Sequence, residues 1–161
     1  MRRKLFAILV AASLPALMGH GEGCGSGDEE ATALGALTGA TCPDRSTLTY
    51  ETFGRNFMES YCTRCHSSTL SGEERRGAPL YHDFDTLEGA RSTPDHIDEQ
   101  AGFGPNAENL FMPPERCPST KGGPLDKKCD MPTAEERRNL AMWIACERKR
   151  TFMRDAGIDA P

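Results

Sequence analysis

The sequence lacks the features of a large enzyme or of a nucleic-acid-binding protein. It has no paired carboxylates in an apolar setting, no Ser–His–Asp signature and no glycine-rich phosphate loop. Its net charge is −5, and its basic residues are mostly interleaved with acidic ones, so no basic face would bind a phosphate backbone. With 161 residues the chain is long enough for one small domain. We therefore predict that the protein is not an enzyme and does not bind nucleic acid.

Periodic apolar patterning in the sequence is helical. No segment shows a useful length of the alternation that is typical of β-strands, and no internal repeat is present. Phe53, Phe57 and Tyr61 recur every four residues, which is typical of one face of a helix. Thr133 followed by Glu136 forms a capping box that opens the clearest helix. The pattern predicts an all-α fold with helices over residues 49–65, 85–92, 93–101 and 133–150.

The N-terminus has the layout of a secretory signal peptide, which we place at residues 1–23. Residues 2–4 are basic, and the apolar run of residues 5–18 is short and interrupted by Pro15. That run is too short for a confident membrane span. Export would place the mature protein in the periplasm or cell envelope, where disulfides form.

The segment after the signal peptide is predicted to be a flexible tether over residues 24–41. It is rich in Gly, Ala, Thr and acidic residues and has no periodicity. Its first residue, Cys24, resembles the lipidated Cys of a bacterial lipoprotein, although the preceding Gly21-Glu22-Gly23 differs from the usual Leu-Ala-Gly. Lipidation and simple cleavage remain alternatives. The domain is then expected at residues 42–150, with a tail at residues 151–161.

The most specific motif is the C-x-x-C-H pattern of c-type haem attachment, formed by Cys62, Cys65 and His66. Two thiols three positions apart can each form a thioether with one haem vinyl group, and His66 then ligates the iron. This composition would produce the motif by chance in about 0.01 of such chains. A zinc site would need a second compact pair of ligands, which the sequence lacks. A thioredoxin-like redox pair would need a βαβ context, which it also lacks. The motif predicts one covalent haem.

Residues 48–147 resemble the cytochrome c family. The first helix of that family carries a Gly, an aromatic residue and the first Cys at four-residue steps, and Gly54, Met58 and Cys62 stand at these steps here. In the family's last helix an aromatic residue packs across the first helix near the Gly, and Trp143 is placed to do so. The resemblance implies a cytochrome c fold: a few helices around one haem, with the first and last helices crossing.

The resemblance also implies a second axial ligand to the iron, a Met from a loop before the last helix. Met112 and Met131 both lie in predicted loops and both precede Pro. The Met112 segment resembles the Met-Pro-Pro sequence of the family, whereas Met131 lies two residues before the Thr133 cap and has little loop with which to reach the iron. Met112 is therefore the favoured ligand and Met131 the alternative. The remaining alternatives for the sixth position are His82, His96 or no protein ligand at all.

Seven cysteines are many for a chain of this length. With Cys24 and the haem pair set aside, the other four allow three disulfide pairings. We favour Cys117–Cys129 as a local loop clamp and Cys42–Cys146 as a staple from the start of the domain to its last helix. Residues 115–130 would then be a pinned insertion before that helix.

The function predicted from these features is one-electron transfer by a covalently bound haem. The protein would exchange electrons with redox partner proteins, or serve as the electron-accepting module of a larger oxidoreductase. A lipid on Cys24 would hold it near a membrane partner. Two alternatives remain: a haem-based gas or redox sensor with an open sixth site, and a non-haem, disulfide-stapled structural lipoprotein in which the motif is coincidental.

Overall fold

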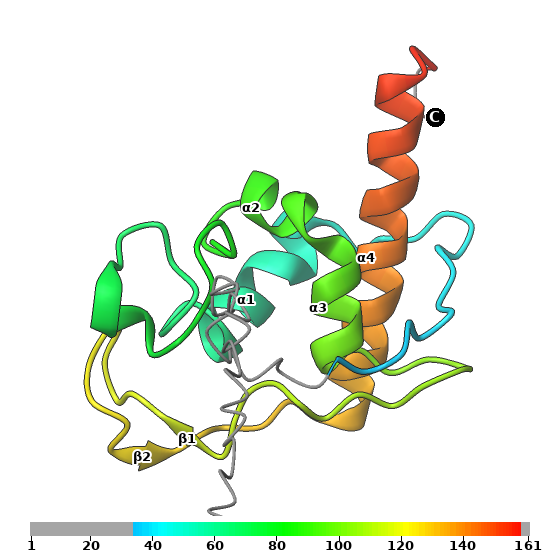
Figure 1. Cartoon of the computed structure of the whole chain (residues 1–161). Coiled ribbons are helices and arrows are strands. Elements are labelled where there is room, and N and C mark those ends of the chain that lie inside the picture. The colour runs from blue at the N-terminus through cyan, green and yellow to red at the C-terminus, as the bar shows by residue number, and fades with distance from the viewer. Residues whose placement is uncertain (1–33, 159–161) are drawn as a thin grey trace, which may run out of the picture. The chain divides into compact units, whose positions relative to one another are not determined.

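The computed structural model describes residues 34–158, which are rich in helix. None of the helices in this described range is both long and apolar enough to cross a membrane. The elements are η1 (a π-helical turn, Tyr50–Gly54), α1 (Arg55–Tyr61), η2 (a 3₁₀ turn, Gly72–Arg75), α2 (Leu87–Ser92), α3 (Pro94–Ala101), β1 (Arg116–Cys117), β2 (Lys127–Lys128) and α4 (Ala134–Asp155) (Figure 1).

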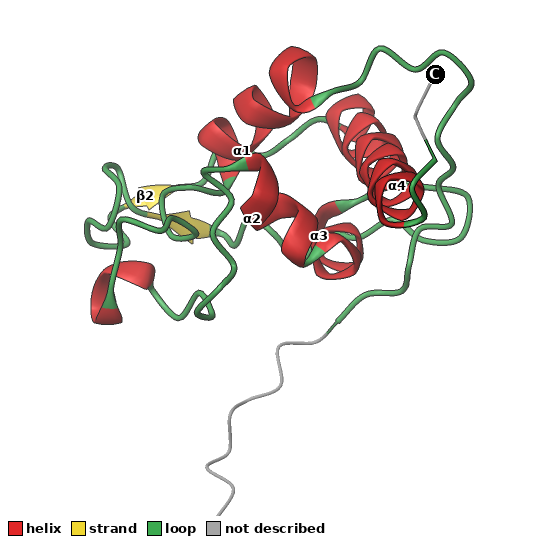
Figure 2. Ribbon diagram, turned by 90° about the horizontal axis from the view of Figure 1, so that it is seen from above, coloured by secondary structure: helices red, strands yellow, loops and turns green. Residues whose placement is uncertain are grey.

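The helices enclose the core, and the β1–β2 pair and η2 lie to one side of it (Figure 1). Helix α3 packs along α4, and α2 contacts both of them. Figure 2 shows the β1–β2 pair and η2 on the side of the molecule away from α4. The core therefore forms between η1–α1, α2–α3 and the first turns of α4, where Phe57, Met58, Leu140, Trp143 and Ile144 are all buried.

The first helical segment is shorter and less regular than the predicted helix over residues 49–65. It begins with a capping box, in which the Thr49 side chain accepts from the Thr52 amide. The π-helical turn η1 then leads into α1, and the helix ends with Cys62 as its C-cap. Residues 62–65 form turns instead of a further helical turn. The C-x-x-C-H motif thus lies directly after the helix.

The crossing of the first and last helices is close at Gly54, as the sequence led us to expect. A Cβ atom placed on Gly54 would lie 2.5 Å from Cζ2 of Trp143. Trp143 is fully buried, and its ring centroid lies 6.3 Å from those of Tyr50 and Phe53. Only Gly lets the two backbones approach this closely over the indole ring.

Replacing Gly54 by Ala is expected to lower the free energy of unfolding by about 1–2 kcal/mol, because overpacking against Trp143 outweighs the better helix propensity of Ala. Denaturant unfolding would measure the loss. Ser60→Ala, at an exposed position of α1, is the matched control and should leave stability unchanged or slightly higher. A G54A variant as stable as the wild type would show that the indole ring can move away without cost.

The later helices lie where they were predicted, with corrected ends. The cap of α2 is Thr86, whose side chain accepts from the Gly89 amide, and not Asp85. The capping box of Thr133 and Glu136 opens α4 as predicted, because each side chain accepts a backbone amide of the other residue. Helix α4 continues to Asp155, so part of the expected tail at residues 151–161 is helical.

The described residues are rich in helix but also contain one short β-ladder that the sequence did not predict. Arg116 pairs with Lys128 and Cys117 with Lys127 in a short antiparallel ladder. Two residues per strand are too few to produce the alternating sequence pattern by which a strand is recognised. The ladder closes the segment that was expected to be a pinned insertion.

The expected tether over residues 24–41 was wrong for its described part, residues 34–41. Thr38 is fully buried, and its amide and hydroxyl donate to the carboxylate of Asp98 at 2.9 and 2.7 Å. The side chain of Asn109 donates to the carbonyl of Ala36 at 2.8 Å. This segment, which we call the strap, has no regular secondary structure and is held against the domain by a few separate hydrogen bonds, so its sequence needs no periodicity. The expected signal peptide, residues 24–33 of the tether and Cys24 lie outside the described residues.

Two disulfides join the cysteine pairs that the sequence analysis favoured. Cys117 is bonded to Cys129 next to the β1–β2 ladder. Cys42 is bonded to Cys146, which links the chain before η1 to the middle of α4 across 104 positions of sequence. Together they leave Cys62 and Cys65 as the two free thiols of the described residues.

Candidate cofactor site

The C-x-x-C-H motif folds as a tight turn at the end of α1. The Cys62 amide donates to the carbonyl of Met58 at 2.8 Å, completing the last turn of the helix. The amides of Cys65 and His66 then both donate to the carbonyl of Cys62, at 3.2 and 3.0 Å. This turn brings both thiols and the imidazole to the wall of one cavity.

The cavity has a volume of about 540 Å³. That is within the range of about 300–1,000 Å³ that is common for cofactor pockets, which are likewise mostly apolar. Helices α1, α3 and α4 and the loops at residues 76–84 and 112–117 all contribute to its wall. Its apolar lining includes Phe57, Phe84, Ile97, Ala101, Pro113 and Leu140.

The two thiols of the motif are not joined to each other. Burial raises the pKa of the Cys62 thiol to about 12 and also raises the pKa of Cys65. A disulfide oxidoreductase needs the opposite, a thiol with a lowered pKa. Among residues 34–158 no three or more His, Cys, Asp or Glu side chains are grouped to hold a metal ion. Burial thus favours the protonated form of two thiols that face an apolar cavity.

The imidazole of His66 is fixed from two directions. Its ring stacks on the ring of Phe84, with centroids 4.8 Å apart and an interplanar angle of 20°. Its Nδ1–H donates to the main-chain carbonyl of His82 at 3.3 Å. Burial lowers the pKa of His66 to about 4, so the ring is neutral near pH 7. With Nδ1 used in this way, Nε2 is the nitrogen that remains for a metal, as in metal-ligating histidines generally.

Met112 lies on the wall of the same cavity, although it is 46 residues after His66 in the sequence. Its amide donates to the carbonyl of Gln100 at 2.9 Å. Its carbonyl accepts from Nη1 of the buried Arg137 at 2.8 Å. These bonds fix the backbone of Met112 on both sides of its Cα atom, against α3 and α4.

The other candidate ligands are less well placed. Met131 is 45% exposed and does not line the cavity. His96 lines the cavity, whereas His82 does not. The two imidazole ring centroids lie 4.5 Å apart. The structure therefore brings Met112 and His96, but not Met131 or His82, to the cavity that contains His66.

The pinned segment of residues 115–130 packs on the chain around the motif. The amide of Gly122 donates to the carbonyl of Arg64 at 3.0 Å, and the Arg64 side chain donates to the carbonyl of Pro118 at 3.0 Å. Arg76 donates to the carbonyl of Gly123 at 2.8 Å. The Cys117–Cys129 disulfide thus stabilises a cover over one side of the site.

Three residues that hold the site were not recognised from the sequence. Phe84 stacks on His66, Arg137 donates to the Met112 carbonyl, and Arg75 donates to the His82 carbonyl at 3.3 Å. Arg137 has a signal in hindsight, because it precedes Leu140 and Ile144 at helical spacing on the inward face of α4. Arg75 has none, since it stands in a run of alternating charge that is typical of solvated surface.

Comparisons with protein families, with curated proteins and with solved structures found no match to this chain. The chemistry and geometry of the described residues are therefore what bears on its function.

Proposed function

We propose that this protein is a one-electron carrier with a single c-type haem held by Cys62, Cys65 and His66. The observation that supports this most is the shared cavity. Two protonated thiols, a neutral imidazole and the side chain of Met112 line one apolar space of cofactor size. These are the donor types and the spacing that covalent haem attachment requires.

The thiols have the chemistry for attachment without an added oxidant. Each Cys S–H would add across one vinyl C=C bond, so that a C–S bond forms and the proton passes to the other vinyl carbon. The two cysteines that are free in the structure are the two that this reaction consumes, while the other four described cysteines are already paired. Haem supplies reversible one-electron oxidation and reduction of its iron.

The protein's own contribution is to hold the axial ligands and to exclude water. The stacked Phe84 and the His82 carbonyl fix the His66 ring, and the bonds to Gln100 and Arg137 fix the Met112 backbone. The apolar walls limit solvent at the iron, which together with a Met ligand favours a high reduction potential. Met112 is the proposed sixth ligand, and electron exchange with a redox partner protein needs no further substrate pocket.

The proposed location is the cell envelope, after export. The two disulfides support an oxidising compartment. Attachment to a membrane through a lipid on Cys24 is part of the same proposal, and mass spectrometry of the mature protein would test it.

Covalent haem is the decisive test. The protein expressed with a c-type maturation system should keep haem through denaturation and give a pyridine haemochrome spectrum. The double variant Cys62→Ala/Cys65→Ala should lose all covalent haem, and each single variant should retain a single thioether, with a shifted haemochrome band. Cys117→Ala/Cys129→Ala serves as the control and should keep its haem. A wild-type protein without covalent haem would rule out the carrier.

A further inference from the structure

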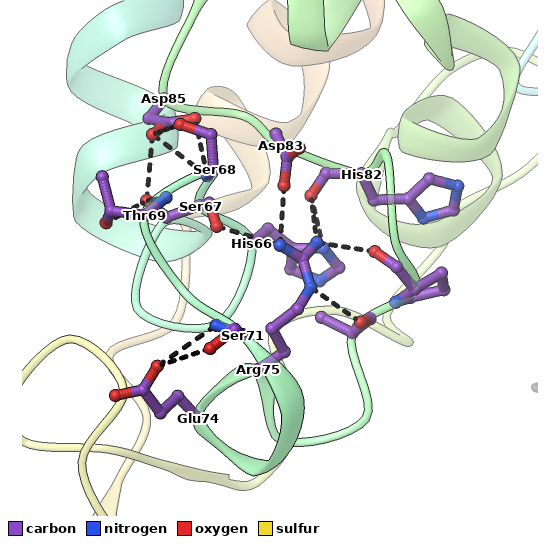
Figure 3. Close-up of polar contacts among 12 residues, drawn as sticks. His66, Ser67, Ser68, Thr69, Ser71, Glu74, Arg75, His82, Asp83 and Asp85 are labelled. Carbon is purple, nitrogen blue, oxygen red and sulfur yellow. Dashed lines mark hydrogen bonds and ion pairs between the residues drawn. The ribbon is translucent and has the colours of Figure 1, made fainter.

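Arg75 is a buried cation in the loop that follows the motif. Its side chain is only 4% exposed. All five guanidinium N–H groups have an acceptor, and Figure 3 shows the group surrounded by the loop that it organises. The acceptors are the carbonyls of Ala78 (3.1 Å), Ser67 (2.9 Å), Pro79 (2.6 Å) and His82 (3.3 Å) and the carboxylate of Asp83 (2.7 Å).

Two of these acceptors connect Arg75 to His66. The carbonyl of Ser67 belongs to the residue directly after His66. The carbonyl of His82 accepts both from Nη2 of Arg75 and from Nδ1 of His66, each at 3.3 Å. The four other acceptors fix the guanidinium in place, so its Nη2 can hold that carbonyl where Nδ1 of His66 reaches it.

We propose that Arg75 is a positioning residue for the axial histidine, acting through the main-chain carbonyl of His82. This inference rests on the proposed function. A guanidinium with five fixed acceptors holds the loop in one geometry, which a single-point ammonium cannot do. The hydrogen bond at the outer nitrogen of a ligating His sets the ring orientation and its basicity. Arg75 thus tunes His66 without touching it.

The ion pair with Asp83 makes this arrangement feasible in a buried loop. An unpaired buried guanidinium would be costly, and Asp83, about one quarter exposed, balances the charge at 2.7 Å. The same carboxylate fixes the rotation of the guanidinium, so that Nη2 points to His82. Asp83 is accordingly the second residue that positions His66, because it orients Arg75.

The test is Arg75→Lys in the haem-loaded, full-length protein. Lys keeps the charge but loses the fork, so the His82 carbonyl is released and the hydrogen bond to His66 weakens. The exchange of the His66 Nδ1–H with solvent, measured by NMR in the reduced protein relative to the amides of α4, should become roughly tenfold faster. A weaker bond makes the imidazole a poorer electron donor, so the reduction potential should shift upward.

Arg91→Lys is the matched control. Arg91 is also mostly buried and pairs with a carboxylate, that of Glu147, at 2.7 Å, but it joins α2 to α4 and has no described contact with His66. The Arg91→Lys substitution should lower the melting temperature while leaving both the exchange of the His66 Nδ1–H and the reduction potential unchanged. A purely structural Arg75 would behave in the same way as Arg91.

If Arg75→Lys does not fold, Asp83→Asn decides the matter. It keeps Arg75 but removes the partner that orients it, so exchange at His66 should again be faster, by a smaller factor. Covalent haem in the wild type together with unchanged exchange in the folded variant would overturn the role of Arg75 alone. Absence of covalent haem in the wild type would instead overturn the proposed function.

Discussion

In the Met112→Ala variant, the weak near-infrared sulfur-to-iron band of the oxidised protein should be lost completely. The band needs a thioether sulfur on the iron, and Met112 is the Met whose backbone is fixed at the cavity wall. The reduced variant should also bind carbon monoxide readily, because Ala leaves the sixth position open, whereas the Met-capped wild type should bind it poorly. Near-infrared absorption and carbon monoxide titration measure the two effects.

Met131→Ala is the control for this experiment. Met131 is exposed and away from the cavity, so its loss should change neither the band nor gas binding. An unchanged band in Met112→Ala would refute Met112 as the ligand. If the wild type has no band but binds carbon monoxide only weakly, His96 becomes the ligand, and His96→Ala should then open the site.

Removing the Cys42–Cys146 disulfide should destabilise the protein more than removing Cys117–Cys129. In the chain-entropy description, a bridge stabilises by restricting the unfolded chain, and the effect grows with the closed loop. The two bridges span 104 and 12 positions. The expected losses are about 5 and about 3 kcal/mol in the free energy of unfolding.

The comparison uses the double variants Cys42→Ala/Cys146→Ala and Cys117→Ala/Cys129→Ala, both unfolded by denaturant with the haem content held equal. Double substitution avoids leaving an unpaired thiol. The difference between the two variants, about 2 kcal/mol, is the informative quantity because errors common to both cancel. Equal losses, or a larger loss for the short bridge, would show that packing at the bridges outweighs chain entropy.

The helical parts of this fold were predictable because their signals are local. The capping box at Thr133 lies within four residues of sequence, and the buried face of α4 follows the helical repeat over Leu140, Trp143 and Ile144. The first helical segment was placed correctly but its end was not, since the turn at Cys62 depends on hydrogen bonds of the motif itself.

The strap and the short ladder were not predictable for a common reason. Each is held by a few contacts that leave no periodic pattern in the sequence, such as Thr38 to Asp98 in the strap and the two residue pairs of the ladder. The sequence around Thr38 consists of Ala, Gly, Leu and Thr without periodicity, as a flexible linker can. Composition therefore cannot distinguish a segment that a few hydrogen bonds hold against the domain from a flexible linker.

In the candidate site, the C-x-x-C-H motif could be recognised from the sequence, whereas the residues that surround it could not. Cys62, Cys65 and His66 lie within five positions, so their spacing alone predicts a haem-attachment motif. Met112 was selected through resemblance, and its place at the cavity wall depends on long-range bonds to Gln100 and Arg137. Side chains that position others, such as Arg75, carry no local pattern.

The cysteine arrangement has a consequence for the order of maturation. Six described cysteines could form 15 complete sets of disulfides, whereas four could form only three. On the proposed function, attachment of haem to Cys62 and Cys65 before oxidation would exclude the twelve sets in which a motif cysteine pairs with one of the other four, and would leave only the three pairings of those four. Cofactor loading would then act as a proofreading step for disulfide formation, and a chain oxidised before loading would be prone to scrambled bridges.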